Sequence, residues 1–112
     1  QGYSSAASDV YKRQAVRCGS GAVYTGVNVY SIHGACAEQV AIGSAITNGE
    51  RVLEAIAAVR GKDGSELLPP CGSCRQLLAD YAPECEVILP VNGVAQKVPA
   101  KDLLPFAYHA EA

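Results

Sequence analysis

The chain has 112 residues, of which 49% are hydrophobic, and a formal net charge of -2. This length supports one domain with one hydrophobic core and is too short for two. The charge is nearly balanced and slightly acidic, so the chain offers no basic field for a polyanion and we expect no nucleic acid partner. No apolar run reaches the roughly 20 residues of a membrane-spanning helix, so we expect no membrane partner and a cytoplasmic location.

The first predicted elements form a hairpin. Residues 1–14 are polar, rich in small side chains and without a helical or strand period, so we expect an atypical, disordered or artefactual segment there. A single domain is expected to span residues 15–112. Residues 15–18 and 22–29 are β-prone and flank Gly19, Ser20 and Gly21, a pattern that predicts two strands joined by a turn. Asn28 then lies at the end of the second strand.

A buried helix is predicted next, over residues 36–48. This stretch is apolar around much of its circumference, and Asn48-Gly49 supplies a helix stop. Residues 52–59 contain alanines and fit either a strand or an extension of the helix. We favour the strand, because it completes a β-α-β crossover between parallel strands.

The second half contains a loop, a helix and short strands. Residues 61–70 have the glycines, charges and prolines of an exposed loop. Residues 71–82 place Leu77, Leu78 and Tyr81 at helical spacing and end before Pro83. Residues 87–89 predict a short strand, residues 94–98 an edge strand, and the tail is expected to be partly helical. Strands alternating with two helices indicate an α/β fold.

Three of the five cysteines follow metal-ligand spacing. Cys71 and Cys74 are three residues apart at a predicted helix start, so they can bind one ion together, and Cys36 lies at the start of the other helix. Three thiolates leave a fourth position for water, which is typical of a catalytic zinc site. Glu38 is rotated by about 200° from Cys36 around the helix, so it is a poor ligand and a good candidate for proton transfer.

Both helix starts suit thiolates. Unpaired backbone N–H groups and the positive end of the helix dipole favour thiolate over thiol. Arg75 directly follows the last ligand, and we expect it to donate a charge-assisted hydrogen bond to a ligand sulfur.

Two other interpretations stay open at this point. Cys71 and Cys74 alone fit a redox dithiol, although such a protein has no need of Glu38. His33, three residues before Cys36, could close the site as a fourth ligand and make the zinc structural.

The motifs resemble those of a known family. CAE at residues 36–38 and PCGSC at residues 70–74 are similar to the signature of the cytidine deaminase superfamily, and TGVNVY, RQLL and LLP extend the resemblance over most of the chain. Within the superfamily the chain looks closest to blasticidin S deaminases, and next to free-nucleoside cytidine deaminases.

The resemblance implies a three-layer α/β/α sandwich with a mixed sheet of about five strands. It implies that Cys36, Cys71 and Cys74 hold Zn²⁺ and that Glu38 moves protons between the activated water and the cytosine ring. It also implies a homotetramer in pyrimidine salvage, with a small cytosine nucleoside or analogue as substrate.

Substrate contacts are implied at three further positions. Asn28 would bind a sugar hydroxyl, and Tyr108 would lie near the substrate, often in a neighbouring subunit's pocket. Cytidine-specific members carry glutamate at the position of Tyr30, whereas blasticidin S deaminases carry tyrosine there, as this chain does. Cytidine, deoxycytidine and blasticidin S therefore remain candidate substrates. Editing of nucleic acid ranks last, because it needs a basic channel and stacking aromatics, and the chain has one Phe and no Trp.

Overall fold

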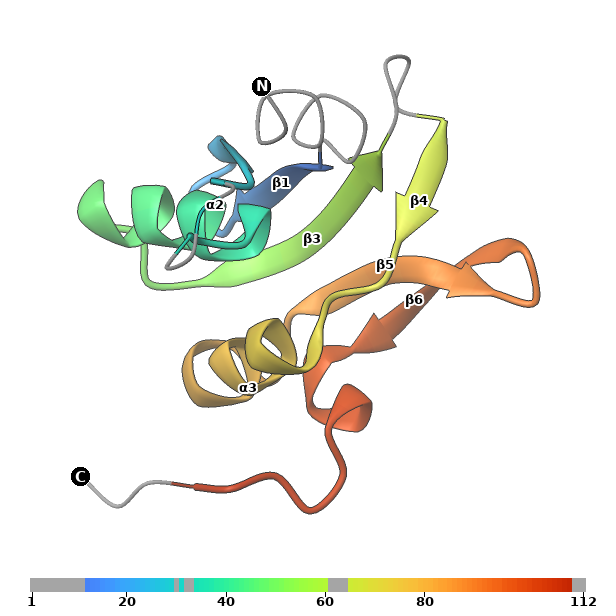
Figure 1. Cartoon of the computed structure of the whole chain (residues 1–112). Coiled ribbons are helices and arrows are strands. Elements are labelled where there is room, and N and C mark those ends of the chain that lie inside the picture. Colours follow the sequence, from blue (N-terminus) through green and yellow to red (C-terminus); the bar gives the residue numbers. More distant parts are fainter. Residues whose placement is uncertain (1–11, 30, 32–33, 61–64, 110–112) are drawn as a thin grey trace.

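The protein is built on a six-stranded mixed β-sheet, seen in a computed structural model that describes residues 12–29, 31, 34–60 and 65–109 (Figure 1). The strands are β1 (Lys12–Cys18), β2 (Val23–Val27), β3 (Leu53–Arg60), β4 (Glu66–Leu68), β5 (Glu86–Val91) and β6 (Val94–Pro99). The helices are α2 (Ala37–Thr47), α3 (Gly72–Tyr81) and the short 3-10 helix η1 (Ala100–Leu103).

The sheet has the order β2-β1-β3-β5-β6, and β4 pairs with the end of β3. β1 is antiparallel to both β2 and β3, whereas β3 and β5 are parallel. β2 and β3 therefore run in the same direction, as the predicted crossover requires, but they do not pair with each other. The hairpin partner of β1 already occupies one of its edges, so the crossover through α2 delivers β3 to the other edge.

Most predicted elements are confirmed, with two differences. β1 begins at Lys12, three residues before the predicted start, and Arg13 and Gln14 pair with residues of both neighbouring strands. The predicted loop of residues 61–70 contains β4, which pairs with β3. Residues 1–11, and with them most of the segment predicted to be atypical, lie outside the described residues.

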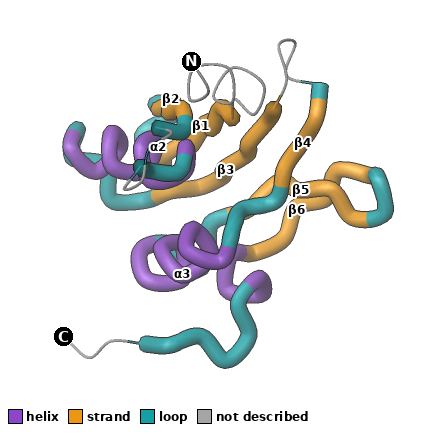
Figure 2. Tube along the Cα trace, viewed as in Figure 1, coloured by secondary structure: helices purple, strands orange, loops and turns teal. Residues whose placement is uncertain are grey.

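One face of the sheet carries the hydrophobic core. Val16 of β1, Ile56 of β3 and Val87 of β5 form one buried cluster with Ile42 of α2 and Leu78 of α3. Both helices therefore cover the same face, and Figure 2 shows them beside the sheet. The predicted α/β fold with a mixed sheet is confirmed. The described residues contain no helix on the other face, so they show two layers of the predicted three-layer sandwich, and the third stays a prediction. Within the same ranges no helix is long and apolar enough to span a bilayer.

α2 packs closely on the hairpin. Ala37, Ala41 and Ala45 repeat every four residues and are completely buried, so the helix turns a smooth stripe of small side chains toward the strands. At Gly26 of β2 an added Cβ would lie 2.5 Å from the Ala41 backbone nitrogen, which shows how near the first turns of α2 approach. The helix ends as predicted, with Gly49 at a φ of 85°.

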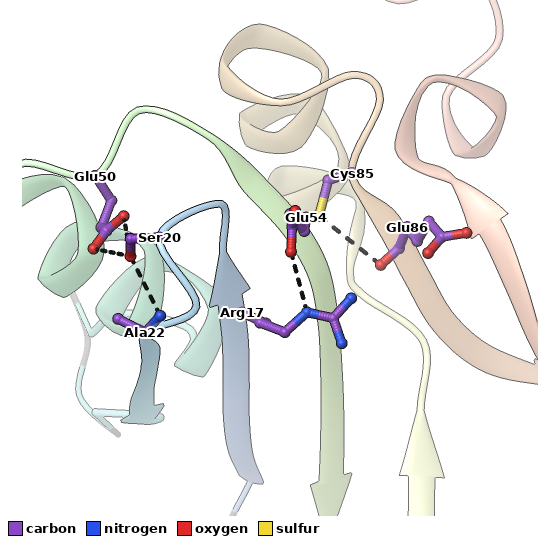
Figure 3. Close-up of polar contacts among 7 residues, drawn as sticks. All are labelled: Arg17, Ser20, Ala22, Glu50, Glu54, Cys85 and Glu86. Atoms are coloured by element: carbon purple, nitrogen blue, oxygen red, sulfur yellow. Dashed lines mark hydrogen bonds and ion pairs between the residues drawn. The ribbon is translucent and has the colours of Figure 1, made fainter.

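Polar contacts fix the far end of α2 to the hairpin turn (Figure 3). Ser20 donates to both carboxylate oxygens of Glu50 at 2.8 and 2.9 Å, and its own Oγ accepts from the Ala22 N–H at 3.3 Å. Across the sheet, Arg17 Nε donates to Glu54 at 3.3 Å. The Ser20–Glu50 contacts fix the chain that directly follows α2, and the start of the helix is positioned by its close packing on Gly26.

Candidate metal centre

Three cysteine sulfurs converge at the starts of α2 and α3. The Cys36 and Cys71 sulfurs are 3.7 Å apart, those of Cys71 and Cys74 are 3.4 Å apart, and all three lie within 4.8 Å of one another. A tetrahedral zinc ion with Zn–S bonds of about 2.3 Å holds its sulfurs about 3.8 Å apart. The predicted ligands are thus brought together with a spacing that fits zinc.

Cys36 is positioned by the loop between β2 and α2. Val29 and Ala35 exchange backbone hydrogen bonds at 2.8 and 3.1 Å, which closes the loop immediately before Cys36. Gly34 is required in this closure, because a Cβ there would lie 1.8 Å from the Val29 carbonyl oxygen. Cys36 is the N-cap of α2, and its backbone N–H donates to Gln39 Oε1 at 3.1 Å.

Cys71 and Cys74 are positioned by the start of α3. Cys71 is the N-cap, with extended backbone angles of -72° and 171°, and its carbonyl accepts from the Arg75 N–H at 2.9 Å. Cys74 follows within the first turn and is completely buried. Both helix starts therefore direct unpaired N–H groups and a positive dipole end toward the sulfurs.

The thiols differ in how readily they ionise. Burial raises the pKa of Cys36 and of Cys74, and the nearby carboxylate of Glu38 raises both further. Burial also acts on Cys71, but its pKa is lowered, because hydrogen bonds with the Cys74 backbone N–H and with the thiols of Cys74 and Cys36 favour its thiolate. A cation is needed to hold all three sulfurs as thiolates.

Glu38 lies beside the sulfurs and outside their group. Its side chain is 1% exposed, in the first turn of α2, and its charge acts on the pKa of Cys74. The cluster of candidate ligands in the described part of the chain consists of the three cysteines and does not include Glu38. A buried carboxylate next to a zinc site can accept and release a proton. His33, the alternative fourth ligand, lies outside the described residues.

Arg75 connects three segments around the site. Its Nε donates to the Pro70 carbonyl at 2.9 Å and its Nη1 to the Leu103 carbonyl at 3.2 Å. Arg75 thus fixes the backbone that leads into Cys71 and ties it to η1. Its predicted hydrogen bond to a ligand sulfur stays a prediction.

The predicted substrate contacts are only partly described. Asn28 is half-buried and precedes Val29, so it lies close in the chain to the bridge that positions Cys36. Tyr30 lies outside the described residues. Tyr108 is 75% exposed, and its carbonyl accepts from Gln76 Nε2 at 2.8 Å, which fastens the tail to α3. The substrate roles of these residues stay predictions.

Gln39 and Gln76 are positioning residues that the sequence analysis missed. Gln39 was detectable, because glutamine three residues after an N-cap is the pattern of a capping box. The partner of Gln76 lies 32 residues away in the chain, so no local pattern could reveal it.

A separate cavity of about 400 Å³ lies at the opposite end of α2. It is lined by Ile46, Gly49, Glu50, Arg51, Leu53 and Tyr81. The 11 residues of α2 span about 16 Å, so this cavity is distant from the cysteines and is not their substrate pocket.

Comparisons with known proteins agree with the geometry. The family model of the cytidine and deoxycytidylate deaminase zinc-binding region matches residues 12–89. Blasticidin-S deaminase of Bacillus cereus is 37% identical over 103 residues, covering 84% of this chain and 74% of that protein. A cytidine deaminase of Halalkalibacterium halodurans is 40% identical over 78 residues, covering 68% and 58%. The crystal structure of a cytidine deaminase from Burkholderia pseudomallei superposes with a TM-score of 0.76 at 33% identity, covering 90% and 84%.

Proposed function

The chain belongs to the cytidine and deoxycytidylate deaminase family of zinc-dependent hydrolases, which act on cytosine C–N bonds, and on this premise we propose that its substrate is a free cytosine nucleoside or a nucleoside analogue. In the proposed reaction water replaces the exocyclic amino group, so that the cytosine ring becomes a uracil ring and ammonia leaves. Cytidine, deoxycytidine and blasticidin S are the candidate substrates.

The observation that carries the proposal is the triangle of sulfurs with a buried carboxylate beside it. Cys36, Cys71 and Cys74 would hold zinc and leave one coordination position open. Zinc, when bound, supplies a Lewis acid that activates water near neutral pH. Glu38 would take a proton from that water, deliver it to the ring nitrogen and then assist the departure of ammonia.

The proposal extends to the surroundings of the site. Asn28 would bind a sugar hydroxyl, and Tyr30 and Tyr108 would contact the substrate. A homotetramer is included, because the exposed side chain of Tyr108 is free to reach the pocket of a second copy. A cytoplasmic location is part of the same proposal. The clear relation to a blasticidin-S deaminase supports the antibiotic as a substrate beside the two nucleosides.

The Glu38→Gln variant tests the proposed chemistry. It keeps the size of the side chain and removes its capacity to carry a proton, so we expect ammonia release to fall by at least a hundredfold while zinc stays bound. Ammonia release and the loss of ultraviolet absorbance would be measured on all three candidate substrates, with zinc content by atomic absorption.

Glu54→Gln is the matched control. Glu54 is an exposed carboxylate on β3 that forms an ion pair with Arg17, so its amide should leave turnover unchanged. Undiminished ammonia release by Glu38→Gln would refute the role of Glu38. Zinc binding by a wild-type chain that turns over none of the three compounds would instead indicate a structural zinc protein.

A further inference from the structure

Gln14 is a buried amide with no partner for its oxygen. Among the described residues, Gln14 and Glu38 are the two buried side chains that carry an amide or a carboxyl group, with exposed fractions of 4% and 1%. Gln14 Oε1 is enclosed and accepts no hydrogen bond. Nearly all buried polar groups in native proteins have a partner, and an exception is commonly explained by a water or a ligand.

The strand register shows which way Gln14 points. It lies directly opposite Gly26 on β2 and Ala58 on β3. It also alternates along β1 with Val16 and Cys18, both completely buried in the core beneath the helices. Its side chain therefore faces the helix-covered side of the sheet. Since a Cβ on Gly26 would meet Ala41 and Ala37, the first turns of α2 lie over this level of the sheet.

This level is the end of the sheet at which the cysteines converge. Glu38 directly follows Ala37 in the turn that lies against Gly26. On the other side, Ala58 pairs with Leu68, which is three residues before Cys71. The paired residues Gly26, Gln14, Ala58 and Leu68 thus form one row across the sheet. This row runs from the start of α2 to the segment that leads into α3. The two buried polar side chains share the end of the sheet that carries the metal site.

We propose that the Gln14 carboxamide lines the substrate pocket beside Glu38 and forms a hydrogen bond to a polar group of the bound substrate. This inference rests on the proposed deamination and names a further residue that positions the substrate. A carboxamide both donates and accepts, so it suits either the amino and carbonyl groups of the base or a hydroxyl of the sugar. The substrate then supplies the partner that the protein itself does not give to Oε1.

The Gln14→Met variant tests this contact. Methionine has nearly the same length and shape but cannot replace the hydrogen bonds of the amide. In the zinc-loaded full chain we expect KM to rise about tenfold or more with little change in kcat, because a binding contact is lost. Zinc content and Tm should not fall, since the amide oxygen that the change removes has no partner within the protein. KM and kcat would be measured on cytidine, deoxycytidine and blasticidin S.

The substrates distinguish the two sources of the contact. A rise in KM on all of them assigns Gln14 to the base, and a rise on cytidine alone assigns it to the 2′-hydroxyl. Cys18→Ala is the control, because Cys18 is buried on the same face at the other end of β1. It should lower Tm and leave KM unchanged.

Two outcomes would overturn the role of Gln14, and only one of them would also overturn the proposed function. If the wild type turns over a substrate and Gln14→Met shows the same KM on each, Gln14 is an internal amide and the contact is wrong, while the proposed function stands. If the wild type turns over none of the compounds, the proposed function fails and the role of Gln14 fails with it.

Discussion

At the scale of single residues, two buried cysteines of this chain have different chemistry. Cys74 is 3.4 Å from the sulfur of Cys71 and one helical turn from a positive dipole end. Cys85 is also buried, but its Sγ faces the Glu86 carbonyl at 3.9 Å (Figure 3). Burial, with Cys18 and Glu86 nearby, raises the pKa of Cys85 to about 12. Burial raises the pKa of Cys74 as well, so the difference lies in the cation that Cys74 can share with Cys36 and Cys71, whereas Cys85 lies outside that cluster of sulfurs.

This difference predicts opposite results for two alanine variants. Cys74→Ala removes a proposed ligand, so we expect it to lose bound zinc and at least a hundredfold of activity. Cys85→Ala should keep one zinc per chain and full activity, and should lower the free energy of unfolding by about 1 kcal/mol. Zinc content and chemical denaturation check both. Retention of stoichiometric zinc by Cys74→Ala would exclude it as a ligand.

Residue spacing predicted which three cysteines come together, and it could not predict the contacts that position them. The cysteines are identified by short intervals at helix starts, which depend only on local structure. The carbonyl partners of Arg75 belong to Pro70 and to Leu103, 28 residues away, and backbone carbonyls carry no side-chain signal in a sequence. Gln14 was likewise placed outside the domain, because its strand reads as polar.

At the scale of elements, the approach of α2 to β2 decides where the site forms. The first turns of α2 carry Glu38 and rest on Gly26, where a Cβ would lie 2.5 Å from one backbone nitrogen and 2.8 Å from a backbone oxygen. Backbone atoms cannot rotate away as side chains do. The start of α2 must therefore move if Gly26 gains a side chain.

We accordingly predict that Gly26→Ala lowers the free energy of unfolding by about 1–3 kcal/mol and weakens zinc binding, because the shift displaces Cys36. Gly43→Ala is the matched control. Gly43 lies in α2, and no atom lies within 4 Å of a Cβ added there. Alanine at this position should therefore stabilise the protein by about 0.5–1 kcal/mol. Denaturation and zinc titration measure both. Equal zinc affinity in the two variants would contradict the close contact at Gly26.

The elements found by sequence were those with a strong local signal. α2 has an apolar sequence and an Asn48-Gly49 stop, and both of its ends were predicted within one residue. β4 has only three residues and is fixed by its pairing with the end of β3 and by Arg60, which donates to Glu66 at 3.1 and 2.6 Å, so its own short sequence carries little signal. β1 begins early for a similar reason, because partners on both sides override the polar character of its first residues.

At the scale of the whole molecule, the site joins the two halves of the chain. Cys36 comes from the helix that follows the β1–β2 hairpin, whereas Cys71 and Cys74 come from the helix that leads into β5 and β6 (Figure 1). An ion bound by all three would cross-link these halves. Because an unfolded chain does not hold the three sulfurs together, zinc binds the folded state preferentially and stabilises it.

Removal of the metal should therefore destabilise the entire domain and not the site alone. With free zinc at a hundred times its Kd, binding adds about 2.7 kcal/mol to the free energy of unfolding, so chelation is expected to lower Tm by about 10 °C or more in a domain of this size. Differential scanning calorimetry with and without a chelator measures the shift. Cys74→Ala, which should bind little zinc, is expected to show almost none. A single transition that moves as one unit would show that the cross-link acts on both halves, whereas an unchanged Tm in the wild type would contradict a metal that joins them.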